Sequence, residues 1–126
     1  LRSDYQKTRI EQMCERLGVR SYTPLWHHDP EMHMRELVSH GHDIVVTSVS
    51  AEGLDESWLG KVLTNESLEL LFKIARKYRF NVDGEGGEFE TSVTNSPWMR
   101  KSIQIQSTSH WTGRRGWVDI WTAELL

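Results

Sequence analysis

A short apolar run between two helical patterns constrains the fold of this chain more than any other feature. Residues 43–49 have the sequence Asp-Ile-Val-Val-Thr-Ser-Val, which is β-branched and almost entirely apolar in its middle. Such a run is typical of a strand buried on both faces, as in a parallel or mixed sheet. Because helical patterns lie before and after it, the sequence predicts an α/β to α+β fold with helices flanking a mixed sheet.

Three helices are predicted from capping residues and from apolar positions at helical spacing. The first starts with a capping box at Ser3 and ends at Gly18. The second starts after Asp29, a good N-cap that a proline follows, and it runs to Gly41. The third begins near Asn65 and fades at residues 77–79, where cations favour a helix C-terminus.

The last third of the chain changes from helical spacing to alternation. Residues 88–93 alternate, and residues 103–106 alternate again after a break at Pro97. The segment Gly113-Arg114-Arg115-Gly116 is typical of a hairpin loop, and the strand after it carries Trp117 opposite Val118. We therefore predict a C-terminal antiparallel hairpin.

Charge and cysteine content narrow the classes of function. The 126 residues carry a net charge of -3, which gives no general attraction to nucleic acid or to an anionic membrane. No apolar run approaches the roughly 20 residues that span a bilayer. The single Cys14 excludes an internal disulfide, so the simple expectation is a reducing, cytoplasmic protein. Cys14 also falls on the apolar face of the first helix, which favours a small core residue over a nucleophile.

Residues 84–91, Gly-Glu-Gly-Gly-Glu-Phe-Glu-Thr, concentrate glycines and carboxylates in one turn. Glycine permits positive φ and close approach, and carboxylates offer acceptors and proton transfer. One interpretation is an ordinary solvated acidic turn, and the other is a preorganised polar site. The alternation places Glu88 and Glu90 on one face of a strand, about 7 Å apart, with Phe89 on the other face.

Other candidate groups are assigned ordinary roles. The spacing of histidines 27, 28, 33, 40 and 42 lacks a metal-binding pattern, so we expect surface histidines and no metal site. Arg114 and Arg115 are interpreted as an exposed hairpin tip rather than a nucleic-acid clamp. Trp26 and Trp58 occupy loop positions, where an aromatic side chain either packs in the core or walls a cleft.

Several motifs in order resemble the diphthine–ammonia ligase family, ATP-dependent enzymes of the PP-loop ATP pyrophosphatase superfamily. They are Ser-Asp-Tyr-Gln-Lys-Thr-Arg at 3–9, Pro-Leu-Trp at 24–26, Gly-Leu-Asp at 53–55 with Trp-Leu-Gly-Lys at 58–61, and the octapeptide at 84–91. The octapeptide is the most specific of these motifs, and each of the others is weak by itself. The resemblance runs from residue 3 to about residue 98, and beyond that only a strand-rich ending is shared.

The resemblance implies a fold, a reaction and a set of site residues. ATP, with Mg²⁺, would activate the diphthine carboxylate on elongation factor 2 as an acyl-adenylate, and ammonia would then displace AMP. Residues 1–23 would end the nucleotide-binding domain, and residues 24–126 would form a C-terminal substrate-binding domain. The implied catalytic residues are Glu85, Glu88 and Glu90. The implied cleft residues are Tyr5, Gln6, Arg9, Trp26, Trp58, Gly84, Gly86, Gly87 and Thr91.

One departure from the family limits what this chain is expected to do. Family members carry a Ser-Gly-Gly-Lys-Asp-Ser type loop near their N-terminus, whereas this chain has none and begins at Leu1. We therefore expect an N-terminal nucleotide-binding portion to be missing, and these 126 residues alone to release neither AMP nor pyrophosphate from ATP. Two alternatives stay open: a related PP-loop protein of cobamide salvage, and a non-catalytic binding module.

Overall fold

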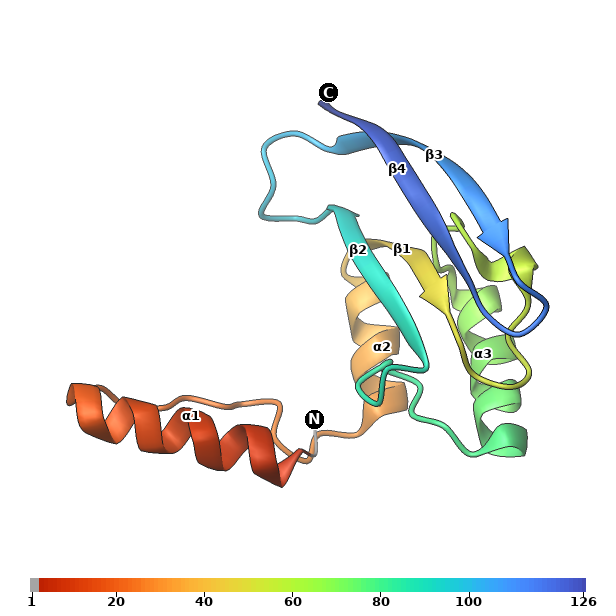
Figure 1. Cartoon of the computed structure of the whole chain (residues 1–126). Coiled ribbons are helices and arrows are strands. Elements are labelled where there is room, and N and C mark those ends of the chain that lie inside the picture. The colour runs from red at the N-terminus through yellow and green to blue at the C-terminus, as the bar shows by residue number, and fades with distance from the viewer. Residues whose placement is uncertain (1–2) are drawn as a thin grey trace.

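The computed structural model describes residues 3–126, and Figure 1 shows how its elements are arranged. In chain order the elements are α1 (Asp4–Leu17), α2 (Pro30–Ser39), β1 (Asp43–Val49), the 3-10 helix η1 (Glu56–Trp58), α3 (Asn65–Tyr78), β2 (Phe89–Asn95), β3 (Ile103–Trp111) and β4 (Gly116–Leu125). The leading residues Leu1 and Arg2 lie outside the described range.

The helix ends follow the predicted capping residues. Ser3 accepts a hydrogen bond from the backbone N–H of Gln6, and Gly18 ends α1 in the left-handed conformation. Asp29 caps α2 in the same manner, directly before the helix begins. For α3 the N-cap is Thr64, one residue earlier than predicted, because Thr64 and Ser67 form a reciprocal capping box.

The four strands form one sheet in the order β2-β1-β4-β3. The predicted combination of helices and sheet with a C-terminal hairpin is confirmed, but the pairings described between these strands are all antiparallel, not mixed. The apolar run of β1 reflects its central position, since β2 and β4 pair with it and residues 61–63 bond to its first half. A central antiparallel strand is buried as deeply as a parallel one. The amino-acid composition of β1 therefore did not reveal whether its neighbours run parallel or antiparallel to it.

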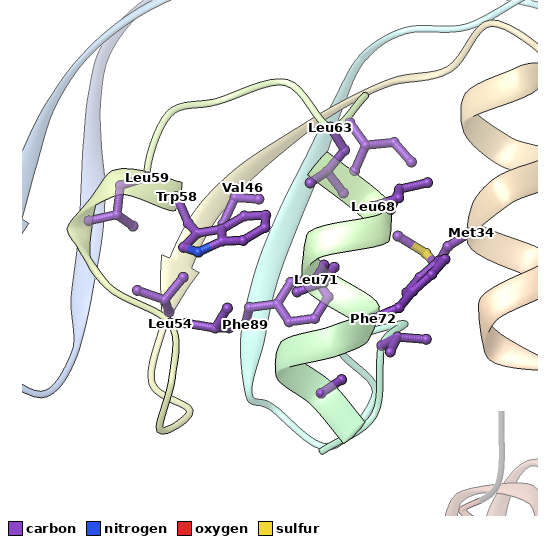
Figure 2. Packing of buried hydrophobic residues seen from close by; sticks show 14 residues of the cluster. Met34, Val46, Leu54, Trp58, Leu59, Leu63, Leu68, Leu71, Phe72 and Phe89 are labelled. Carbon is purple, nitrogen blue, oxygen red and sulfur yellow. The ribbon is translucent and has the colours of Figure 1, made fainter. Parts of the chain in front are cut away.

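The core lies between the sheet and the helices α2 and α3. Leu68, Leu71 and Phe72 of α3 are at most 1% exposed and meet Met34 of α2 and Val46 of β1 (Figure 2). This packing uses the helical spacing predicted for α3. The helices and the 3-10 turn thereby fix the position of the sheet. The loops that leave the sheet carry the polar side chains of the candidate site.

Helix α1 stands apart from this core (Figure 1). None of its residues is buried over its described length, and Met13 and Leu17 on its apolar face are 48% and 69% exposed. Cys14 is only half-buried, so its expected role as a core residue is wrong. The amphipathic pattern predicted the helix correctly, but nothing in the described chain covers the apolar face.

In the part of the chain that the structure describes, no helix is both long and apolar enough to cross a membrane.

Gly53, in the segment after β1, gives a first testable expectation. Its φ is +93°, and an added Cβ would lie 2.8 Å from Cγ2 of Ile74 and even closer to the ring of Tyr78. Gly53→Ala is therefore expected to destabilise the fold by about 2–4 kcal/mol, from backbone strain and steric overlap together. Gly113→Ala is the matched control, because φ is +92° there but nothing lies within 4 Å of an added Cβ. Urea unfolding of both variants would show whether the cost at Gly53 exceeds the cost at Gly113.

Candidate functional site

The acidic glycine stretch forms two tight turns between α3 and β2. The Gly84 N–H donates to the Asn81 carbonyl at 3.3 Å, and the Gly87 N–H donates to the Gly84 carbonyl at 3.1 Å. Gly84 and Gly87 have φ of 74° and 82°, a region that side chains disfavour. An added Cβ on Gly84 would also lie 2.8 Å from the Phe89 carbonyl oxygen. These two glycines are therefore required by the shape of the loop itself.

Glu88 folds its carboxylate back into these turns. The Asn81 backbone N–H lies 3.4 Å from its Oε1, and an added Cβ on Gly86 would lie 2.7 Å from its carboxyl carbon. Within residues 3–126, its Oε2 is buried and accepts no hydrogen bond. A buried acceptor without a donor is uncommon in folded proteins. Gly86 thus leaves the space that the carboxylate fills.

Glu88 and Glu90 do not form the pair on one strand face that the alternation predicted. Strand β2 begins only at Phe89, so Glu88 belongs to the turn, whereas Glu90 is exposed on the strand beside Thr91, which is also exposed. Phe89 is 2% exposed in the core, as predicted. The two carboxylates therefore have different surroundings, and only Glu88 is partly buried.

A second segment fixes the loop to the end of β1. The backbone N–H groups of Ser50 and Ala51 both donate to the Glu88 carbonyl, at 2.9 and 3.1 Å, and the Ser50 hydroxyl donates to the Gly87 carbonyl at 2.9 Å. These bonds set the position from which the Glu88 side chain turns back. Sequence reasoning missed Ser50, although its position directly after the central strand is a signal for such a role.

A small pocket of about 110 Å³ brings together three predicted site residues from three segments. Gln6 of α1, Trp26 of the connector and Glu85 of the acidic loop line it. Lys7 also lines it, and its Nζ lies 5.3 Å from the centre of the Trp26 ring, within cation–π range. The pocket therefore combines an aromatic wall with groups of both charges.

The other predicted cleft residues lie elsewhere. Tyr5 and Arg9 form an open surface on α1, where the Arg9 guanidinium lies 5.8 Å from the Tyr5 ring. Trp58 is 7% exposed and packs in the core near Val46 and Leu54, so it walls no cleft (Figure 2). Its short 3-10 helix, capped by Asp55, turns the indole inward.

Comparison with known proteins identifies the fold family. The family model described as the diphthamide synthase C-terminal domain matches residues 29–126. The chain belongs to the diphthamide synthase C-terminal domain family. This match contains β1, the acidic loop and the whole sheet, whereas α1 and Trp26 lie before it.

The related proteins carry a consistent name. A diphthine–ammonia ligase of Rattus norvegicus is 36% identical over 107 residues, which cover 84% of this chain and 40% of the rat protein. The human protein of that name gives the same identity and coverage. The Schizosaccharomyces pombe protein is 39% identical over 103 residues, covering 82% of this chain and 17% of its own length. The chain thus spans two-fifths or less of the length of these relatives.

Not all of the histidines that the sequence places on the surface are exposed. His27 and His40 are exposed as expected, but His28 and His33 are half-buried, with ring centres 5.6 Å apart at a near-perpendicular angle. Nε2 of His28 is buried and neither donates nor accepts a hydrogen bond within the described range. It lies 3.9 Å from Oε2 of Glu36. No group of three or more His, Cys, Asp or Glu in residues 3–126 has the geometry to hold a metal ion.

His33 makes stability depend on pH. Burial lowers the pKa of His33 below its usual 6.5, the neighbouring His28 lowers it further, and Asp83 and Glu36 oppose the shift. The folded state then binds the proton less tightly than the unfolded chain does, so the free energy of unfolding falls as pH drops below about 6.5. Urea midpoints measured between about pH 7 and pH 5 would show this fall. His33→Gln is expected to reduce the slope, and an unchanged slope would contradict the assignment.

Proposed function

We propose that this chain is the C-terminal, substrate-side part of an ATP-dependent ligase that converts diphthine on elongation factor 2 to diphthamide with ammonia. The observation that carries the proposal is the family match over residues 29–126, together with relatives named diphthine–ammonia ligase. Residues 1–23 would belong to a nucleotide-binding PP-loop domain and residues 24–126 to the substrate domain. The start of the match at residue 29 and the separation of α1 from the core support this division. The proposal places the reaction in the cytoplasm.

The reaction has two steps. A carboxylate oxygen of the substrate attacks the α-phosphorus of ATP, which forms the acyl-adenylate and releases pyrophosphate. Ammonia then attacks the acyl carbon, AMP leaves with the bonding electrons of the broken C–O bond, and the added nitrogen loses a proton. The second step therefore needs a group that positions the nitrogen and accepts that proton.

Glu88 is the best placed residue of this chain for the second step. Its Oε2 is buried without a hydrogen-bond donor among the described residues, and the turns at Gly84 and Gly87 hold the backbone that supports it. A carboxylate in that position can accept an N–H of ammonia and then its proton. Glu85, in the pocket with Gln6 and Trp26, would face the nucleotide-binding portion.

Mg²⁺ would accompany the ATP, which the PP-loop domain would hold. The described residues of this chain offer no metal-binding cluster, so no step is assigned to a metal that this chain holds.

The test uses the full-length protein that contains this chain. Incubation with diphthine-bearing elongation factor 2, ATP and ammonium is expected to convert the carboxylate to the amide, with AMP and pyrophosphate released in equal amounts. Mass spectrometry of the modified peptide distinguishes acid from amide. If diphthine remains unchanged while both co-substrates are present, the proposal fails.

A further inference from the structure

A second, larger pocket is lined by Ser50, whose hydroxyl donates to the Gly87 carbonyl of the acidic loop. It has a volume of about 510 Å³ and is formed by the segment after β1 and by the tip of the β3–β4 hairpin, which lie side by side in Figure 1. The first segment contributes Ser50, Glu52 and Gly53, and the hairpin contributes Trp111 and Arg114. None of these five residues belongs to the buried core, although Trp111 packs against it, and the other four are exposed. The pocket therefore opens to solvent between two loops.

Local contacts fix both walls of this pocket. Gly53 packs its backbone against Tyr78 and Ile74 of α3, which leaves no room for a side chain. Trp111 lies over Gly116, where an added Cβ would come within 2.8 Å of its Cε3. The hairpin tip is closed by the Thr112 N–H, which donates to the Arg115 carbonyl at 2.9 Å. The walls are therefore set in place by the fold, which lowers the entropic cost of binding.

The two walls of the pocket carry side chains of opposite charge that form no ion pair within the described residues. Glu52 and Arg114 are both exposed, and within residues 3–126 neither forms an ion pair. Trp111 is half-buried and adds an indole surface between loops of opposite charge. An arginine offers a fork of donors that fits a carboxylate. An aromatic ring with a carboxylate nearby attracts an alkylated ammonium group.

We propose that this pocket binds a side chain that carries both a quaternary ammonium group and a carboxylate. Arg114 binds the carboxylate, whereas Trp111 and Glu52 bind the cation. The inference rests on the proposed function in one respect, because diphthine, the substrate proposed above, bears a trimethylammonium group as well as the reacting carboxylate. Through Ser50, which lines the pocket and donates to the carbonyl of Gly87, the bound side chain lies next to the turns that hold Glu88.

The binding test uses the 126-residue chain and a defined probe. γ-Butyrobetaine carries a trimethylammonium group and a carboxylate, whereas tetramethylammonium and butyrate each carry one of the two. The indole N–H signal of Trp111, assigned by its loss in Trp111→Phe, is followed in ¹⁵N NMR titrations. A saturable shift with γ-butyrobetaine and weaker binding of both single-charge probes is the expected result.

Matched variants separate this pocket from general charge effects. Arg114→Gln and Glu52→Gln are each expected to weaken γ-butyrobetaine binding about fivefold. Arg115→Gln and Glu56→Gln are the controls, because these residues lie next to the pocket in sequence but do not line it. Binding that is absent, equal for all three probes, or weakened as much by the controls would overturn the proposal.

The same variants distinguish failure of the pocket from failure of the proposed function. In the full-length protein, Arg114→Gln is expected to raise KM for elongation factor 2 by a larger factor than it lowers kcat. Active protein whose KM is unaffected by Arg114→Gln contradicts the pocket and leaves the ligase activity standing. Binding of γ-butyrobetaine by a protein that never amidates diphthine contradicts the activity and leaves the pocket standing.

Discussion

Replacing Phe72 by alanine is expected to lower the free energy of unfolding by about 3–5 kcal/mol. Phe72 of α3 is 0% exposed where this helix packs against α2 and the sheet. The guanidinium of Arg35 lies 4.7 Å from the centre of its ring. Alanine would leave a cavity where the helices meet, and the neighbouring side chains would relax only partly. Since domains of this size are stable by about 5–15 kcal/mol, the loss would be a large fraction of the total.

Leu70→Ala on the same helix is the matched control. Leu70 is 53% exposed, so its truncation removes few contacts and is expected to cost less than about 1 kcal/mol. Equilibrium unfolding in urea, followed by circular dichroism, measures both variants. Similar losses for Phe72→Ala and Leu70→Ala would contradict the position of the core described for α3.

The sequence predicted the helices well because their signals are local. Ser3 and Asp29 cap helices within three residues of their own positions, and the apolar spacing of α3 identifies its buried face. These interactions form inside one element, so no knowledge of the rest of the fold is needed. Even the N-cap of α3 was displaced by a single residue.

The errors concern features that depend on distant segments. The burial of β1 comes from its central position between β2 and β4, and this position leaves strand direction undetermined. The pattern of α1 predicts an apolar face but not what covers it, and Cys14 is therefore only half-buried. Trp58 occupies a loop in sequence, but a 3-10 turn directs its ring into the core.

The candidate site shows the same division between local and distant information. The octapeptide at 84–91 was found from composition alone, because glycines and carboxylates rarely gather so densely. That Glu88 leaves the strand face and folds back over Gly86 depends on the geometry of two consecutive turns. The bonds from Ser50 and Ala51 join segments 37 and more residues apart, which no periodic pattern encodes.

Under the proposed ligase function, Glu88→Gln in the full-length protein is expected to slow amide formation by about 100-fold or more. Glutamine keeps the shape of the side chain in the space above Gly86, but it cannot accept a proton from the attacking nitrogen. The first step uses no proton acceptor, so formation of the acyl-adenylate should be nearly unaffected. Single-turnover measurements that follow pyrophosphate release and amide formation separately would resolve the two steps.

Glu90→Gln provides the comparison within the same loop and strand. Glu90 is exposed on β2, where water competes for its oxygens, so we expect its replacement to slow amide formation less than about tenfold. Urea midpoints of both variants would confirm that the fold is retained. If Glu88→Gln slows pyrophosphate release as much as amide formation, the carboxylate acts before ammonia enters and its assignment to the second step is wrong. If Glu90→Gln has the larger effect, the base is the exposed carboxylate, and the buried Oε2 of Glu88 serves only to shape the turn.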